Sequence, residues 1–222
     1  MTMNSNTPLI TGNNNDDSDV RWNEQATSFQ KAKARSPALL ATLTLEMFVA
    51  FVFIQYSDTF NDYGLLIAFQ PVISAVSGNV GLISSSMNTR AISHGLRDPN
   101  SKCLAILPDL KAGIWLGVFI GSIVGTISAF FHNDMCEEED ITVNNSIYFG
   151  IIIGIGQFIS IMTAAISGAF APMLFKFIGG TDPASAAGPL ETAVQDIVGG
   201  TVLLAFSAWG LSNQPHCSLA DI

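Results

Sequence analysis

The sequence predicts an all-α integral membrane protein with five transmembrane helices. Of its 222 residues, 49% are hydrophobic and only 12% are charged, which is about half the charged fraction of an ordinary soluble domain. The charges gather in the N-terminal region and in short loops, and five apolar stretches lie between them. The formal net charge of −9 and the lack of any basic stripe also exclude a nucleic acid partner.

The first 36 residues form a separate region in this prediction. Residues 1–25 are rich in Asn, Asp, Ser and Thr and poor in apolar side chains, a composition that cannot build a packed core. They lack the basic start and the uninterrupted apolar run of a signal peptide. We expect a disordered cytoplasmic segment over 1–36, a membrane domain over 37–210 and a short extracytoplasmic tail over 211–222.

Five apolar segments are each long enough to cross the bilayer as a helix, for which roughly 20 residues suffice. Segment one opens with a proline, which a helix tolerates in its first turn. Segments two and four are long enough to tilt, to break or to project beyond the hydrocarbon core. The expected segments are 37–56, 64–93, 112–131, 147–178 and 183–209.

Basic residues near the apolar segments lie on one side of the predicted membrane domain. They precede segment one, follow segment two and precede the turn between segments four and five, whereas the other loops and the C-terminal tail carry none. The positive-inside rule therefore predicts a cytoplasmic N-terminus and an outside C-terminus. The residues concerned are Lys31, Lys33, Arg35, Arg90, Arg97, Lys102, Lys111 and Lys176.

The predicted outer side has two features with more than one interpretation. The run CEEED at 136–140 could gather cations near an entrance, or could simply be a solvated loop. Cys136 and Cys217 fall on this side and could pair, or could both be free thiols. The three histidines (His94, His132 and His216) lie in expected loops or tails without a nucleophile beside them, so nothing indicates an enzyme.

Segment two carries small and polar residues on one helical face. Small residues allow close helix packing in lipid. Packing does not require the two asparagines, Asn79 and Asn88, whose amide oxygens can replace water around a cation. Asn79 lies about 140° from Ser74 on an ideal helical wheel. We expect Asn79 to join the face only if the backbone departs from a regular helix near Gly78 and Gly81. The face comprises Ser74, Ser77, Gly78, Gly81, Ser84, Ser85 and Asn88.

Segment five carries acids at bilayer depth. Asp182 and Asp196 are fourteen residues apart, so they share a helical stripe about 21 Å long. Segments three to five contain one fixed cation, Lys176, near a loop. An acid without a basic partner in a bilayer indicates a mobile cation or a proton. Oxygen ligands on segments two and five suit magnesium or calcium rather than copper or zinc. Glu191 and Glu46, in segments five and one, receive no role.

Two arrangements of residues match the pattern of a known family. The first, in segment two, combines Pro71, the run Gly78-Asn79-Val80-Gly81 and Arg90. The second runs across segments four and five and consists of Gly168, Pro172, Asp182-Pro183, Gly188-Pro189, Thr192 and Asp196. Both resemble the membrane domain of MgtE-type magnesium channels and of their eukaryotic solute-carrier relatives, and the resemblance covers roughly residues 37–210.

The resemblance implies a homodimer in the lipid bilayer, with a pore along the dimer axis lined mainly by segments two and five. Asp196 would hold hydrated Mg²⁺, the transported ion, in the middle of the membrane. Asp182 would lie near the cytoplasmic end of the pore, and Asn79 would correspond to the family's asparagine in the second helix. Pro189 and Thr192 would sit where the fifth helix faces the ion.

The sequence also departs from the family pattern. Ile83 stands where a glutamine usually follows the GNxG motif, and Ala187 stands where a serine is often found. Bacterial members carry large cytoplasmic domains that sense magnesium and close the pore, and here some 36 residues stand in their place. We therefore expect a pore that conducts without that gate or is controlled otherwise.

Three classes of function follow from these observations. The first is a divalent-cation channel or transporter, with magnesium as the first candidate. The second is a proton- or sodium-coupled transporter of a small solute that uses Asp196 as its protonatable site. The third is a non-transporting membrane scaffold, which the oxygen ligands on both polar stripes disfavour. The sequence does not identify the membrane in which the protein resides.

Overall fold

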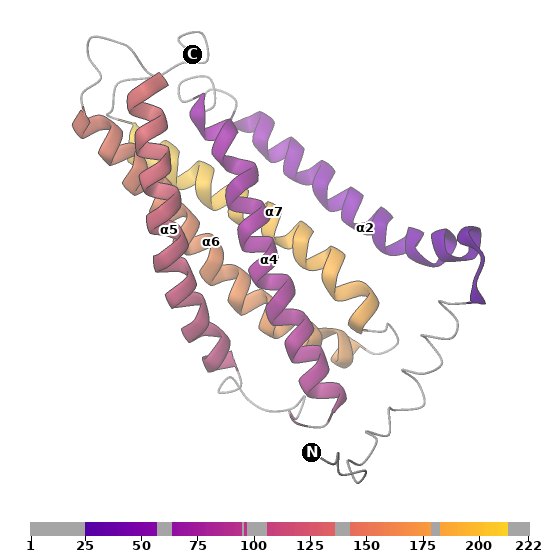
Figure 1. The fold of residues 1–222 in the computed structure, drawn as a ribbon. Helices are drawn as coiled ribbons and strands as arrows, with labels where there is room; N and C mark the ends of the chain where they lie inside the picture. Colours follow the sequence, from indigo (N-terminus) through magenta and orange to yellow (C-terminus); the bar gives the residue numbers. More distant parts are fainter. Residues whose placement is uncertain are drawn as a thin grey trace, which may run out of the picture. The chain divides into compact units, whose positions relative to one another are not determined.

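The chain is described from a computed structural model, which covers residues 25–56, 64–94, 96, 106–135, 143–178 and 183–212. The side chains of 35, 38, 93, 173–178 and 183–191 lie outside the described part. All the secondary-structure elements assigned among these residues are α-helices (Figure 1), which confirms the all-α prediction. The helices are α2 (Ser28–Gln55), α4 (Leu65–Ser93), α5 (Leu107–Met135), α6 (Val143–Ile178) and α7 (Pro183–Leu211).

Four of these helices are long and apolar enough to cross a membrane by themselves, and they fall within α4, α5, α6 and α7. A fifth span is present if Ser28–Ala34 and Leu39–Gln55, the two parts of α2, are counted together. The chain divides into two units, residues 1–40 and 41–222, so α2 belongs partly to each. The sequence predicted five transmembrane helices, and the described residues contain four to five candidate membrane spans.

Helix α2 begins at Ser28, well before the expected start of segment one at Pro37. The Thr27 backbone N–H donates to Gln30 Oε1 at 2.9 Å, and the Gln30 N–H donates to Thr27 Oγ1 at 3.4 Å. This reciprocal pair is a capping box, which satisfies backbone donors at a helix start. Residues 1–24, which hold most of the predicted disordered segment, lie outside the described residues.

Helices α5 and α6 pack through a row of glycines. Gly113, Gly117, Gly121 and Gly125 are buried on one face of α5, four residues apart. A Cβ atom at Gly121 would lie 2.8 Å from the carbonyl oxygen of Gly154 in α6, so the two backbones are in direct contact. Close approach of this kind is the usual source of helix association in lipid, where apolar side chains gain nothing by leaving the surrounding hydrocarbon.

Helix α6 also contacts α4 and α7. A Cβ atom at Gly168 would collide with the backbone of Gly81 in α4, and one at Gly199 in α7 would lie 2.6 Å from the Ser160 hydroxyl of α6. These contacts place α4 and α7 beside the same central helix. They set the distance between the two segments that the sequence analysis singled out.

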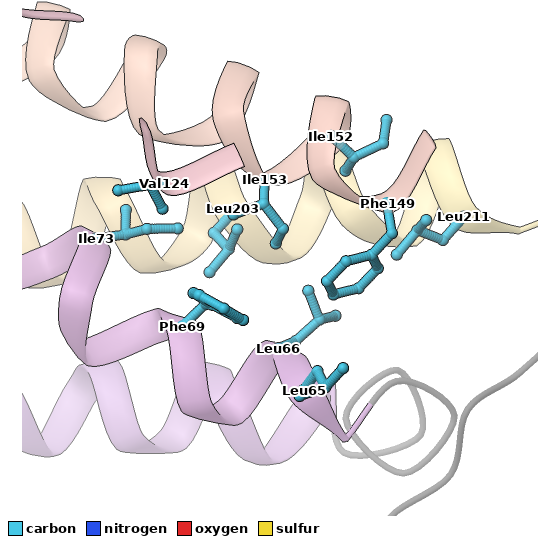
Figure 2. Close-up of a cluster of buried hydrophobic side chains, with 10 residues drawn as sticks. All are labelled: Leu65, Leu66, Phe69, Ile73, Val124, Phe149, Ile152, Ile153, Leu203 and Leu211. Carbon is cyan, nitrogen blue, oxygen red and sulfur yellow. The ribbon is translucent and has the colours of Figure 1, made fainter. Parts of the chain in front are cut away.

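Toward the start of α4, large apolar side chains fill the space between four helices (Figure 2). Phe69 of α4, Phe149 of α6 and Leu203 of α7 point toward one another in this cluster. Its members are Leu65, Leu66, Phe69, Ile73, Val124, Phe149, Ile152, Ile153, Leu203 and Leu211. Beside it, His132 Nδ1 lies 3.0 Å from Ser146 Oγ, which links the end of α5 to the start of α6. The sequence analysis expected His132 in a loop or tail, and this expectation is wrong, because His132 is buried within α5.

Asn88 joins the end of α4 to the start of α5. Its side-chain amide donates to Asp109 Oδ2 at 3.1 Å and to the Ser84 carbonyl at 2.9 Å, and only 3% of the residue is exposed. A buried amide that is hydrogen-bonded in this way accounts for an asparagine on the small-residue face without a cation.

The glycine contact yields a test of the packing. We expect Gly121→Leu to force α5 away from α6, because the new side chain would enter the space of the Gly154 carbonyl. Overpacking of this kind costs about 1–3 kcal/mol, so the unfolding temperature of the purified protein in detergent should fall. Ser122→Leu, on the exposed face of the same helix, is the matched control. Equal unfolding temperatures for the two variants would contradict the described contact.

Candidate functional site

A pocket of about 570 Å³ lies between α4, α7 and the part of α2 within residues 41–55. Most of its wall comes from α4, with α2 and α7 supplying the two acids. The described residues that line it include no lysine, arginine or histidine. They are Glu46, Val49, Ala50, Phe53, Gln70, Pro71, Ser74, Ala75, Gly78, Asn79, Leu82, Thr192 and Asp196.

Three of the five predicted site residues meet in this pocket. Asn79 comes from α4, and Thr192 and Asp196 come from α7, one helical turn apart. The helices touch here, because a Cβ atom at Gly78 would lie 4.0 Å from the methyl carbon of Thr192. Segments separated by more than a hundred residues are thus brought together in one pocket.

The other two predicted residues fall outside what the structure describes. Asp182 directly precedes α7 in the sequence and is not among the described residues. Pro189 lies in the first part of α7, but its side chain is outside the described part. Their place along the proposed ion path stays a prediction.

Asn79 reaches the pocket from an unbroken helix. The sequence analysis expected Asn79 to join the small-residue face only if α4 departed from a regular helix near Gly78 and Gly81. Helix α4 is continuous from Leu65 through Ser93, and Asn79 is exposed whereas Ser77 and Asn88 of that face are buried. The pocket covers a wide arc of α4, so both Ser74 and Asn79 line it. Two residues separated by a large angle on the helical wheel can therefore line the same cavity, provided that the cavity spans a wide arc of the helix surface.

Glu46, which had no assigned role, faces Asp196 in the pocket. Both acids line the pocket, Glu46 from α2 and Asp196 from α7, and their carboxyl groups are close enough to interact. Adjacent carboxylates repel each other unless a proton or a cation lies between them. One sequence signal pointed to Glu46, because it is the single acidic residue within residues 37–56 before the loop. Its partner on α7 could not be inferred from spacing.

An aromatic contact holds this part of α2 against α7. The Phe53 ring packs on Gly200, where an added Cβ atom would lie 2.5 Å from its Cζ atom. Phe53 is two turns along α2 from Glu46, and Gly200 is one turn along α7 from Asp196. The glycine therefore makes room for the ring beside the position where the two acids meet.

The chemistry of the pocket suits a hydrated divalent cation. Its polar groups are two carboxylates together with amide and hydroxyl groups, and hard oxygen ligands of this kind bind magnesium or calcium. Six water molecules occupy about 180 Å³ in the liquid, so a fully hydrated ion fits within 570 Å³. No group of three or more His, Cys, Asp and Glu side chains forms among the described residues.

Comparison with known proteins places this chain in a family. The sequence model of MgtE, described as a divalent cation transporter, matches residues 70–206, which is more than half of the chain. The magnesium transporter MgtE of Enterococcus faecalis is 26% identical over 177 residues, covering 79% of this chain and 36% of that protein. MgtE of Bacillus subtilis is 21% identical over 180 residues, covering 81% of this chain and 37% of that protein.

The chain spans little more than a third of the length of these two curated relatives. The matched region runs from the first half of α4 into α7, and so includes Asn79, Thr192 and Asp196. Together with the apolar helices, the match identifies an integral, multi-pass membrane protein. The chain belongs to the MgtE family.

Proposed function

We propose that the protein moves hydrated Mg²⁺ across a membrane along a path that passes through the pocket of α4 and α7. The observation that carries this proposal is the meeting of Asn79, Thr192 and Asp196 in one pocket whose described lining has no basic side chain. The two relatives named as magnesium transporters support the choice of ion. The reaction is transport rather than covalent chemistry, so no catalytic residue is assigned.

In this proposal Asp196 supplies the charge that binds the ion. Magnesium loses its water reluctantly, so a site that accepts hydrogen bonds from the hydration shell binds it without full dehydration. The Asp196 carboxylate, the Asn79 amide oxygen and the Thr192 hydroxyl offer such acceptors. The Asp182 carboxylate and the backbone around Pro189 would continue the path toward the cytoplasmic side.

A second copy of the chain would complete the pore. Asn79 and Thr192 are exposed in the single chain although they lie on helices that cross the membrane. Polar side chains at membrane depth face a protein interior or a water-filled cavity rather than lipid. A homodimer whose α4 and α7 helices face each other would provide that cavity. The orientation we propose has residues 1–36 in the cytoplasm and residues 211–222 outside, as the basic residues predict.

Removal of the Asp196 charge tests the ion path. We expect Asp196→Asn to lower Mg²⁺ uptake strongly in cells that lack their own magnesium transporters. A charge-assisted contact is worth about 1.5–3 kcal/mol, which corresponds to roughly 10–100-fold in binding. Asp134→Asn, at an exposed position near the end of α5, is the matched control at equal surface expression.

Two outcomes of the uptake assay would contradict the proposal. Equal uptake by wild type and Asp196→Asn would remove this residue from the path. Uptake by neither, with both proteins correctly inserted, would reject the magnesium proposal. Transport of a solute that follows a proton or sodium gradient without divalent ions would then support the coupled transporter.

The proposed dimer axis can be tested by cross-linking. In a chain whose native cysteines are replaced by serine, Thr192→Cys should form covalent dimers with a short bis-maleimide reagent in native membranes. Trp115→Cys, exposed on α5, should not do so. Equal cross-linking at both positions, or only at Trp115, would place the interface elsewhere.

A further inference from the structure

We propose that Glu46 of α2 is a second acidic ligand of the cation site, so that a divalent cation binds between Glu46 and Asp196 of one chain. The inference rests on the proposed function and adds α2 to a site that the sequence analysis confined to the second and fifth segments. The ligand class is a divalent metal cation, whose charge matches that of the two ionised carboxylates.

The first argument is the charge of the pocket. Glu46 and Asp196 are the only titratable side chains among its described lining residues, and they interact directly. Two ionised carboxylates held together without a base repel each other, and a cation or a proton between them removes that repulsion. A divalent cation neutralises both charges, whereas a monovalent cation leaves one uncompensated.

The second argument is an unpaired hydroxyl in the same pocket. Ser74 of α4 is only 6% exposed, and its Oγ atom has no hydrogen-bond partner in the described structure although Ser74 lines the cavity. A buried hydroxyl without a partner costs about 1–3 kcal/mol, and such groups ordinarily bind water or an ion. Because the Oγ atom is closed off from the cavity in this conformation, a water of a hydrated cation reaches it only when the Ser74 side chain turns toward the pocket.

The third argument is the direction in which α2 presents its residues. Glu46, Val49, Ala50 and Phe53 all line the pocket, and their spacing places them on one helical face. Val49 is 6% exposed and Phe53 packs on Gly200. The same face of α2 that makes these apolar contacts therefore also turns Glu46 toward the pocket.

The test is direct metal binding to the full 222-residue chain in lipid nanodiscs. Binding of Mn²⁺, followed by its electron paramagnetic resonance signal with Mg²⁺ as competitor, would be compared for wild type, Glu46→Gln, Asp196→Asn and the double variant. We expect each single change to weaken Mn²⁺ binding by roughly 10–100-fold, as for loss of a charge-assisted contact. The fold-loss of Mn²⁺ affinity in the double variant should be smaller than the product of the two single fold-losses, since both groups bind one ion. Asp134→Asn should bind like wild type.

A purely structural role for Glu46 has a different signature. Glu46→Gln keeps the size of the side chain, so its unfolding temperature without metal should equal that of wild type or exceed it, because repulsion from Asp196 is removed. A lower unfolding temperature together with unchanged Mn²⁺ affinity would overturn the inference and assign Glu46 to packing. Losses that multiply in the double variant would also overturn it, since they would indicate separate sites.

The outcomes separate this inference from the proposed function. Weaker Mn²⁺ binding in Asp196→Asn but not in Glu46→Gln would reject Glu46 as a ligand and leave the Asp196 path intact. Wild-type binding in both variants would reject the pocket as the cation site altogether.

Discussion

Direct contact between helix backbones is the constraint on which the rest of this structure depends. Membrane helices gain no hydrophobic free energy by packing against one another, so their association requires close van der Waals contact. Glycine supplies it twice around α6, through Gly121 and Gly154 against α5 and through Gly168 and Gly81 against α4. Because α7 packs on the same helix, α4 and α7 are left side by side, with Gly78 next to Thr192. The pocket forms along this contact.

Glu46 and Asp196 are tolerated because they line a pocket with other polar groups, away from the apolar cluster. One end of the bundle is filled by the cluster around Phe69, Phe149 and Leu203. In the pocket, by contrast, side chains from α2, α4 and α7 leave an open volume rather than interdigitate. An ionisable side chain inside a membrane protein normally faces such a cavity. The arrangement explains how one chain can be highly apolar and still carry a carboxylate such as Asp196 within a candidate membrane span.

The sequence was sufficient for the membrane class, the approximate spans and three members of the pocket, because each depends on local pattern. Apolar length marked the spans, and helical spacing aligned Thr192 with Asp196. Helix ends were less predictable, because the start of α2 is set by the capping box of Thr27 and Gln30, which lies before the apolar run. The four-residue spacing of the glycines on α5 is also a local pattern, and it indicates the packing face of that helix. The Glu46–Asp196 pair depends on how α2 rests on α7, and no pattern within either helix specifies that contact.

Helix α2 differs from the others in how little it packs. Helices α4 to α7 make extensive contacts among themselves, whereas α2 makes few with any of them. The element with the fewest contacts is the one that detaches most easily in local opening. If a cation binds between Glu46 and Asp196 as we propose, attachment of α2 and occupancy of the pocket are linked equilibria, because a ligand that binds only the closed form favours closure by mass action. The concentration of that cation around the protein would then set how often α2 leaves its contact with Gly200.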